Sequence, residues 1–177
     1  MFEIFFSLIL SIFLVFSAGI ISSKYLLRLN LNNLEIYEFG FVGIFFLVFL
    51  SFIFHFFFAL NVQTNSFLFA IILILFFINI KKFLSFIKSI NLTFVFISLL
   101  AVFVMTLKYK PNEDYGYYHL PYIINLISEK IVFGLSNIQV NFAWNSTWLN
   151  FSSLFYLPLL KLKGTQLTNS VLFFFAI

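Results

Sequence analysis

Long apolar runs separated by short polar stretches form the main pattern in this chain. The first run extends from Phe2 to Ile21 and is interrupted only by Glu3 near its start. A helix needs about 20 apolar residues to cross the hydrocarbon core of a bilayer. The pattern therefore predicts an all-α, polytopic membrane protein with five transmembrane helices at about Phe2–Ile21, Phe39–Leu60, Phe67–Ile80, Leu92–Leu107 and Trp144–Leu160.

A sixth apolar run begins close to the last residue, Ile177. A dozen residues cannot cross the membrane, so this run is interpreted as the start of a sixth helix in a longer protein. The predicted organisation is four N-terminal transmembrane helices in residues 1–107, an outer-face loop in 108–143, and the fifth helix with the start of the sixth in 144–177. The first run could instead be a signal peptide, but its acidic start and its length favour an uncleaved span.

The composition supports a lipid environment. The chain is 63% hydrophobic and 9% charged, whereas a soluble domain carries roughly 25% charged residues. The 31 phenylalanines say little about function, because any large apolar side chain satisfies the bilayer. The absence of cysteine excludes disulfides, thiolate metal sites and cysteine nucleophiles. The net charge of +4 comes from basic residues between the apolar runs, which is typical of topology determinants and not of a nucleic-acid partner.

The distribution of basic residues predicts the orientation. With five spans and the N-terminus outside, seven basic residues are cytoplasmic and three lie outside. The positive-inside rule favours this arrangement over its inverse, and it predicts a multi-pass protein of the bacterial inner membrane. The cytoplasmic set is Lys24, Arg28, Lys81, Lys82, Lys88, Lys161 and Lys163; the outer set is Lys108, Lys110 and Lys130.

The outer segment from Lys108 to Lys130 concentrates the ionisable chemistry of the chain. It holds three of the six acidic residues and one of the two histidines. Pro111 ends the preceding helix. After Pro121, the spacing of Ile123, Ile124, Ile127 and Ile131 predicts a short amphipathic helix in the plane of the membrane interface.

The adjacent Glu113 and Asp114 are the candidate catalytic residues. A carboxylate at the membrane surface can act as a general base on an acceptor hydroxyl or hold a divalent cation, and His119 could hydrogen-bond a phosphate. The same pair could be a solvated loop, and Asp114 could cap the following helix. His119 could be structural, as could His55 in the second span. A metal or other cofactor stays undetermined, with Asp114 as its ligand if one binds.

A longer string carries a family resemblance. It contains Asp114, then Tyr118-His119-Leu120-Pro121, Gly134-Leu135-Ser136-Asn137 and Asn145-Ser146-Thr147-Trp148. Over about 45 residues it resembles a group of uncharacterised bacterial multi-pass proteins related to the glycosyltransferase-C superfamily. In that superfamily, however, the acidic loop often follows the first span, whereas here it follows the fourth.

The resemblance implies transfer of a sugar from a polyprenyl-phosphate donor on the outer face, during assembly of envelope glycans. It implies catalytic or metal-associated roles for Asp114 and Glu113. It also implies a substrate site formed by five further residues: Tyr118, His119, Asn137, Asn145 and Trp148. Lys108, Lys110 and Lys130 could attract the donor phosphate or be ordinary flanking residues of membrane helices.

Two other functions stay open. A transporter or flippase for a lipid-linked or polar solute would show paired intramembrane charges or broken helices. A non-catalytic assembly subunit would use the polar loop to bind a partner. The sequence predicts the bilayer and a polyprenyl-phosphate-sugar as partners and leaves the oligomeric state, the sugar and the acceptor undetermined.

Overall fold

The computed structural model of the chain describes residues 1–81, 83, 90–108, 115–134, 137 and 146–177. These residues form helices and connecting turns, and the described ranges contain no strand, which confirms the all-α prediction. The elements in chain order are α1 (Phe2–Tyr25), η1 (Leu31–Asn33), α2 (Ile36–Phe57), α3 (Val62–Ile78), α5 (Leu92–Lys108), η2 (Tyr115–His119), α6 (Leu120–Ser128), α7 (Thr147–Leu154), α8 (Lys161–Thr165) and α9 (Thr168–Ala176).

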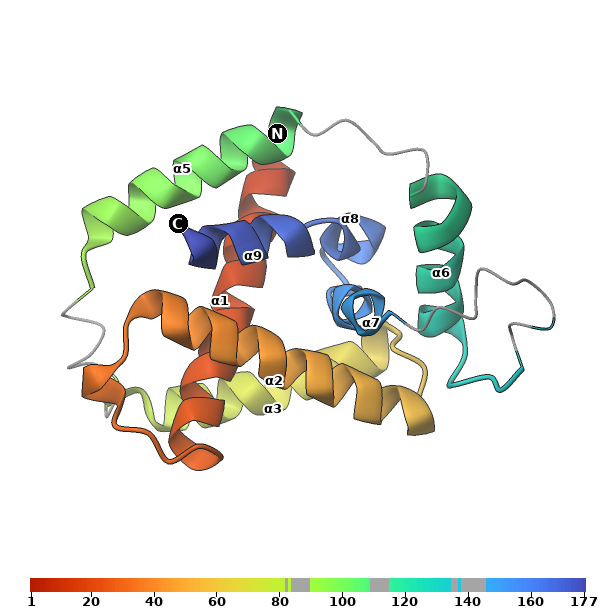
Figure 1. The fold of residues 1–177 in the computed structure, drawn as a ribbon, viewed down its shortest axis with the longest axis horizontal. Helices are drawn as coiled ribbons and strands as arrows, with labels where there is room; N and C mark the ends of the chain where they lie inside the picture. The colour runs from red at the N-terminus through yellow and green to blue at the C-terminus, as the bar shows by residue number, and fades with distance from the viewer. Residues whose placement is uncertain (82, 84–89, 109–114, 135–136, 138–145) are drawn as a thin grey trace.

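The centre of the fold is the crossing of α1 and α2, which Figure 1 shows as two long helices that run across each other. Glycines allow this contact. A Cβ atom built on Gly19 would lie 1.9 Å from the carbonyl oxygen of Phe39, and one built on Gly43 would lie 2.2 Å from the carbonyl oxygen of Val15. The two backbones therefore touch directly, which is the small-residue packing common between helices in membranes.

Two of the described helices, α1 and α2, are long and apolar enough to cross a membrane. The predicted runs at Phe67–Ile80 and Leu92–Leu107 are confirmed as the helices α3 and α5, each of 17 residues and therefore shorter than α1 and α2. The structure supports fewer membrane-length helices than the five-span prediction.

The structure does not support the predicted fifth span at Trp144–Leu160. In its place lies α7, which has eight residues and is about 12 Å long at 1.5 Å per residue. After Phe155 the chain turns sharply, and Gly164 lies so close that an added Cβ would be 2.3 Å from the Phe155 carbonyl oxygen. Figure 1 shows α7 nearly along its own axis, so α7 lies across the direction of α2 and α3.

Contacts define two ends of the helix bundle. At one end, the hydroxyl of Tyr25, the last residue of α1, donates to Asn79 Oδ1 just after α3 (2.6 Å). At the other end, α2 leads into α3 and α6 lies beside the junction, so this end is called the α6 end. The helix α9 starts beside α7, where the hydroxyls of Ser152 and Thr168 are 2.8 Å apart. Its Phe175 ring packs on Gly40 near the start of α2.

Candidate functional site

The helix α6 lies across the junction of α2 and α3. The backbone N–H of Leu60 donates to the carbonyl of Leu126 (2.8 Å), and the N–H of Ile131 donates to the carbonyl of His55 (3.0 Å). The apolar side chains of Ile123 and Leu126 are buried, while Ile124 is 46% exposed. The predicted amphipathic helix is thus confirmed as a helix, and its buried face packs against the bundle and α7.

The side chain of Asn65 fastens α3 to the end of α7. Its Nδ2 group donates to the carbonyls of Leu60 (2.8 Å), Ser153 (2.8 Å) and Tyr156 (3.2 Å). Asn65 is fully buried, and its amide group has two N–H donors, so the three carbonyls share two hydrogens. These bonds set the position of Tyr156 relative to the start of α3.

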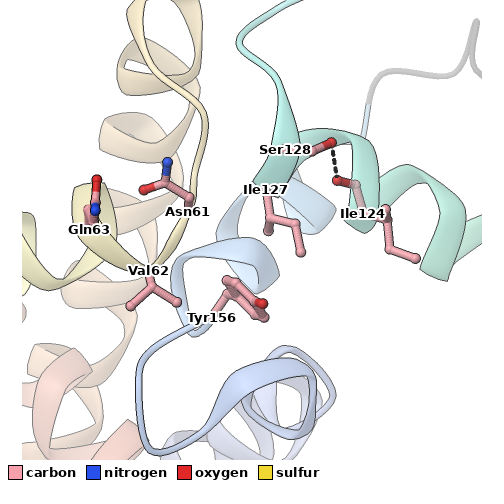
Figure 2. Close-up of a pocket in the computed structure, with 7 residues that line it drawn as sticks. All are labelled: Asn61, Val62, Gln63, Ile124, Ile127, Ser128 and Tyr156. Atoms are coloured by element: carbon pink, nitrogen blue, oxygen red, sulfur yellow. Dashed lines mark hydrogen bonds between the residues drawn. The ribbon is translucent and has the colours of Figure 1, made fainter.

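A groove opens where these elements meet, with a volume of about 490 Å³. Figure 2 shows its wall from α3, its wall from α6, and Tyr156 between them, with Ile127 pointing toward the tyrosine ring. The groove is shallow and open along one side. The lining residues are Asn61, Val62, Gln63, Ile124, Ile127, Ser128 and Tyr156.

The groove combines an apolar floor with uncharged polar groups. The Oδ1 atom of Asn61 accepts the N–H of Thr64 (3.0 Å) and caps α3, which leaves its Nδ2 group as the donor to offer a ligand. The Ser128 hydroxyl donates to the carbonyl of Ile124 (2.8 Å), so its oxygen is oriented to accept. The groove can therefore both donate to and accept from a neutral polar molecule.

Two predicted substrate residues lie at the start of α6. Tyr118 and His119 belong to η2 and are exposed, and the His119 ring is 6.4 Å from the Tyr115 ring. The Tyr115 hydroxyl accepts a hydrogen bond from Gln166 Nε2 (3.1 Å), which joins η2 to the end of α8. On α6, burial raises the pKa of the Tyr122 phenol above its ordinary value.

The other predicted site residues are separate from this pair. Asn137 is exposed, and its backbone N–H donates to the Gly134 carbonyl (2.9 Å). The Trp148 Nε1–H on α7 donates to Asn169 Oδ1 at the start of α9 (3.0 Å). Of the predicted residues that the structure describes, none lines the groove.

Both candidate catalytic residues, Glu113 and Asp114, lie outside the described residues, as does Asn145. In the sequence, Asp114 directly precedes Tyr115, the first residue of η2. The described ranges contain no group of three or more His, Asp or Glu side chains that could hold a metal ion. A metal role for Asp114 thus stays a prediction.

Sequence reasoning missed the groove and Asn65. The stretch Asn61–Ser66, which lies between the predicted spans Phe39–Leu60 and Phe67–Ile80, forms the cap and first turn of α3. An asparagine followed by helix-forming residues is an N-cap signal and could have identified the start of this helix. Nothing local in the sequence indicates that Tyr156 and α6 would meet it.

The fold and the groove define the class of the protein: an all-helical chain with two membrane-length helices and a neutral groove at one end of the bundle. Residues 1–177 match the family model described as a domain of unknown function, DUF8201, and the chain belongs to this family. No curated protein and no solved structure matches the chain.

Proposed function

We propose that the chain is part of a glycosyltransferase-C-like enzyme of the bacterial inner membrane. In this proposal it transfers a sugar from a polyprenyl-phosphate donor to an acceptor hydroxyl on the outer face, with Asp114 as the general base or metal ligand and Glu113 beside it. The resemblance of residues 114–148 suggests this chemistry. The observation that supports the proposal is the placement of η2 and α6 at one end of the apolar bundle.

A membrane location is supported by the outer surface of the bundle. Large apolar side chains are exposed along α2, α3 and α5, including Phe45 at 72%, Ile78 at 73% and Leu92 at 73%. Isolated exposed apolar residues are normal in soluble proteins, but continuous apolar surfaces mark contact with lipid or a partner. We therefore propose that α3 and α5 also lie in the bilayer, tilted or bordered by a thinned membrane as short helices require.

The distribution of basic residues does not decide the orientation of the chain in the membrane. Because α7 does not cross, Lys161 and Lys163 lie on the α6 side, in agreement with the ion pair between Lys163 and Glu3 at the start of α1 (2.7 Å). The basic residues then divide into five on each side of the membrane. The positive-inside rule favours neither orientation, and the outer location of the α6 end rests on the resemblance.

Electrostatics on the α6 side support an anionic donor. Lys130 and Lys161 are exposed there, and each basic residue near a membrane surface attracts anionic headgroups by about 1 kcal/mol. Tyr118 and His119, next to the acidic pair, could then hydrogen-bond the donor phosphate.

Sugar transfer by the full-length protein in liposomes tests this proposal. The donors are radiolabelled polyprenyl-phosphate sugars, and the variants are Asp114→Asn and the exposed control Tyr117→Phe. We expect Asp114→Asn to reduce transfer by about 100-fold or more, the scale of general-base catalysis, and the control to keep the wild-type rate. Undiminished transfer by Asp114→Asn would show that this carboxylate is not the catalytic group.

A broken-helix element favours one alternative, a transporter for a polar solute. The short helices α7, α8 and α9 follow one another with turns between them, and the buried Asn150 and Ser152 lie in this element. Interrupted helices often form solute sites in transporters. Uptake of labelled solute into the same liposomes, without any covalent transfer, would favour this alternative.

A further inference from the structure

We infer that the groove between α3, α6 and Tyr156 is a binding site for a neutral sugar unit of the acceptor. This inference rests on the proposed function, since it assigns the acceptor of that reaction to the glycan class. It follows from the lining of the groove, from its position along α6, and from the chemistry that these two features select.

The lining selects an uncharged ligand. Asn61, Gln63, Ser128 and Tyr156 provide amide and hydroxyl groups, and among the residues that the structure describes no Asp, Glu, Lys, Arg or His side chain lines the groove. A buried or half-buried phosphate needs cations or several N–H donors, which makes this groove a poor phosphate site. Amide side chains are suited to hydroxyl-rich molecules, because a hydroxyl both donates and accepts.

The apolar part of the groove fits the same ligand class. Val62 and Ile127 flank the Tyr156 ring (Figure 2), and a pyranose presents apolar C–H faces between its hydroxyl edges. An aromatic ring with a polar tip is matched to such a surface. A prenyl chain would leave the polar groups Asn61, Gln63 and Ser128 without partners, at a desolvation cost of about 1–3 kcal/mol for each group that becomes buried.

The position along α6 favours the acceptor over the donor. The groove residues Ile124, Ile127 and Ser128 lie in the second half of α6, and the acidic pair precedes Tyr115 at its other end. From Tyr115 to Ile124 the helical rise is roughly 13 Å at 1.5 Å per residue. The reacting bond of a polyprenyl-phosphate sugar adjoins its phosphate, and the proposed function assigns that bond to Asp114, which precedes η2 in the sequence. We therefore assign the groove, at the other end of α6, to the acceptor. An acceptor glycan can extend over this distance.

Binding of neutral disaccharides to the protein in lipid nanodiscs tests the inference. Nanodiscs avoid maltoside detergents, whose sugar headgroups would compete for the groove. The probes are cellobiose, lactose, maltose, mannobiose and chitobiose, measured by saturation-transfer-difference NMR. We expect at least one of them to bind and the Tyr156→Ala variant to weaken its binding at least tenfold. The exposed control Tyr117→Ala, outside the groove, should bind within twofold of wild type.

A second variant covers the case in which Tyr156→Ala fails to fold. Ile124 lies at the rim and is half-exposed, so Ile124→Trp narrows the groove without removing a core contact, and we expect the same tenfold loss. Failure of every disaccharide to bind, or equal binding by Ile124→Trp, overturns the inference. Displacement of the sugar signal by a short prenyl alcohol also overturns it, because the groove would then be a lipid-chain site.

The outcomes separate this inference from the proposed function. If sugar binding depends on Tyr156 but no sugar is transferred in liposomes, the groove is a sugar site and the catalytic role of Asp114 is refuted. If Ile124→Trp transfers sugar at the wild-type rate and Asp114→Asn does not, the proposed enzyme function is supported and the groove is not its acceptor site.

Discussion

The substitution Gly43→Ala tests the packing that holds the bundle together. The added Cβ would lie 2.2 Å from the carbonyl oxygen of Val15 and 2.9 Å from the backbone nitrogen of Gly19. Both neighbours are backbone atoms of α1, so no side-chain rotation can relieve the overlap. To restore an ordinary contact of about 3.4 Å, α1 and α2 must separate by about 1 Å.

The cost of this separation can be estimated. Overpacking a well-packed interface costs about 1–3 kcal/mol, and a rigid backbone contact places this case near the upper value. Replacing glycine by alanine within a helix stabilises the helix by up to about 1 kcal/mol. The clash therefore dominates, and we expect Gly43→Ala to lower the free energy of unfolding by about 2 kcal/mol, or roughly 30-fold in the unfolding equilibrium.

Two other glycines provide matched controls. An added Cβ meets nothing within 4 Å at Gly116, so Gly116→Ala should leave stability unchanged or slightly raised. At Gly40 the added Cβ would lie 2.0 Å from Cγ and 2.7 Å from Cβ of Phe175, which is buried and has little room to move, so Gly40→Ala should also be destabilising. The stabilities of the three variants are compared by unfolding in mixed dodecyl maltoside and SDS micelles, followed by far-UV circular dichroism. If Gly43→Ala is as stable as Gly116→Ala, the direct backbone contact between α1 and α2 is refuted.

Three further predictions concern other contacts, measured by the same unfolding assay. Leu126→Ala removes a buried side chain of α6 and should lower the free energy of unfolding by about 3 kcal/mol. An unchanged transition would mean that α6 does not pack as described. Tyr25→Phe removes the 2.6 Å bond to Asn79 and should cost about 1 kcal/mol or less, and an equal loss in the exposed control Tyr37→Phe would contradict this bond. Glu3→Gln removes an exposed ion pair with Lys163 and should leave the melting temperature unchanged; a clear drop would show that the pair stabilises the fold.

Hydrophobic periodicity alone predicts the long helices well. The first two apolar runs agree with α1 and α2 within a few residues at most boundaries, because a long apolar run has few alternatives to a helix in an apolar environment. The fifth run failed for a physical reason. Its polar residues Ser152 and Ser153 bond to Thr168 and to the carbonyl of Leu149, and after Phe155 the chain turns. A count of apolar residues cannot distinguish such a buried short helix from a membrane span.

The candidate site was predictable only in part. The amphipathic pattern after Pro121 predicted a helix where α6 lies, because the spacing of isoleucines is a local property of the sequence. The predicted apolar face was only partly right, since Ile124 is exposed and Ile131 lies beyond the end of α6. The groove depends on two hydrogen bonds from Asn65 on α3 to Ser153 and Tyr156 at the end of α7, which join residues 88 and 91 positions apart. Such contacts are properties of the fold, and they leave no periodic signal in the chain.

Cysteine labelling at position 114 tests the central claim most directly, because the chain has no native cysteine. The substitutions Asp114→Cys, Tyr117→Cys and Leu26→Cys place single thiols before α6, within η2 and beyond the end of α1. Intact cells are treated with a membrane-impermeant maleimide, before and after permeabilisation. The account predicts that thiols at positions 114 and 117 react in intact cells and that the thiol at position 26 reacts only after permeabilisation. The reverse pattern, with position 114 reachable only from inside the cell, would contradict it.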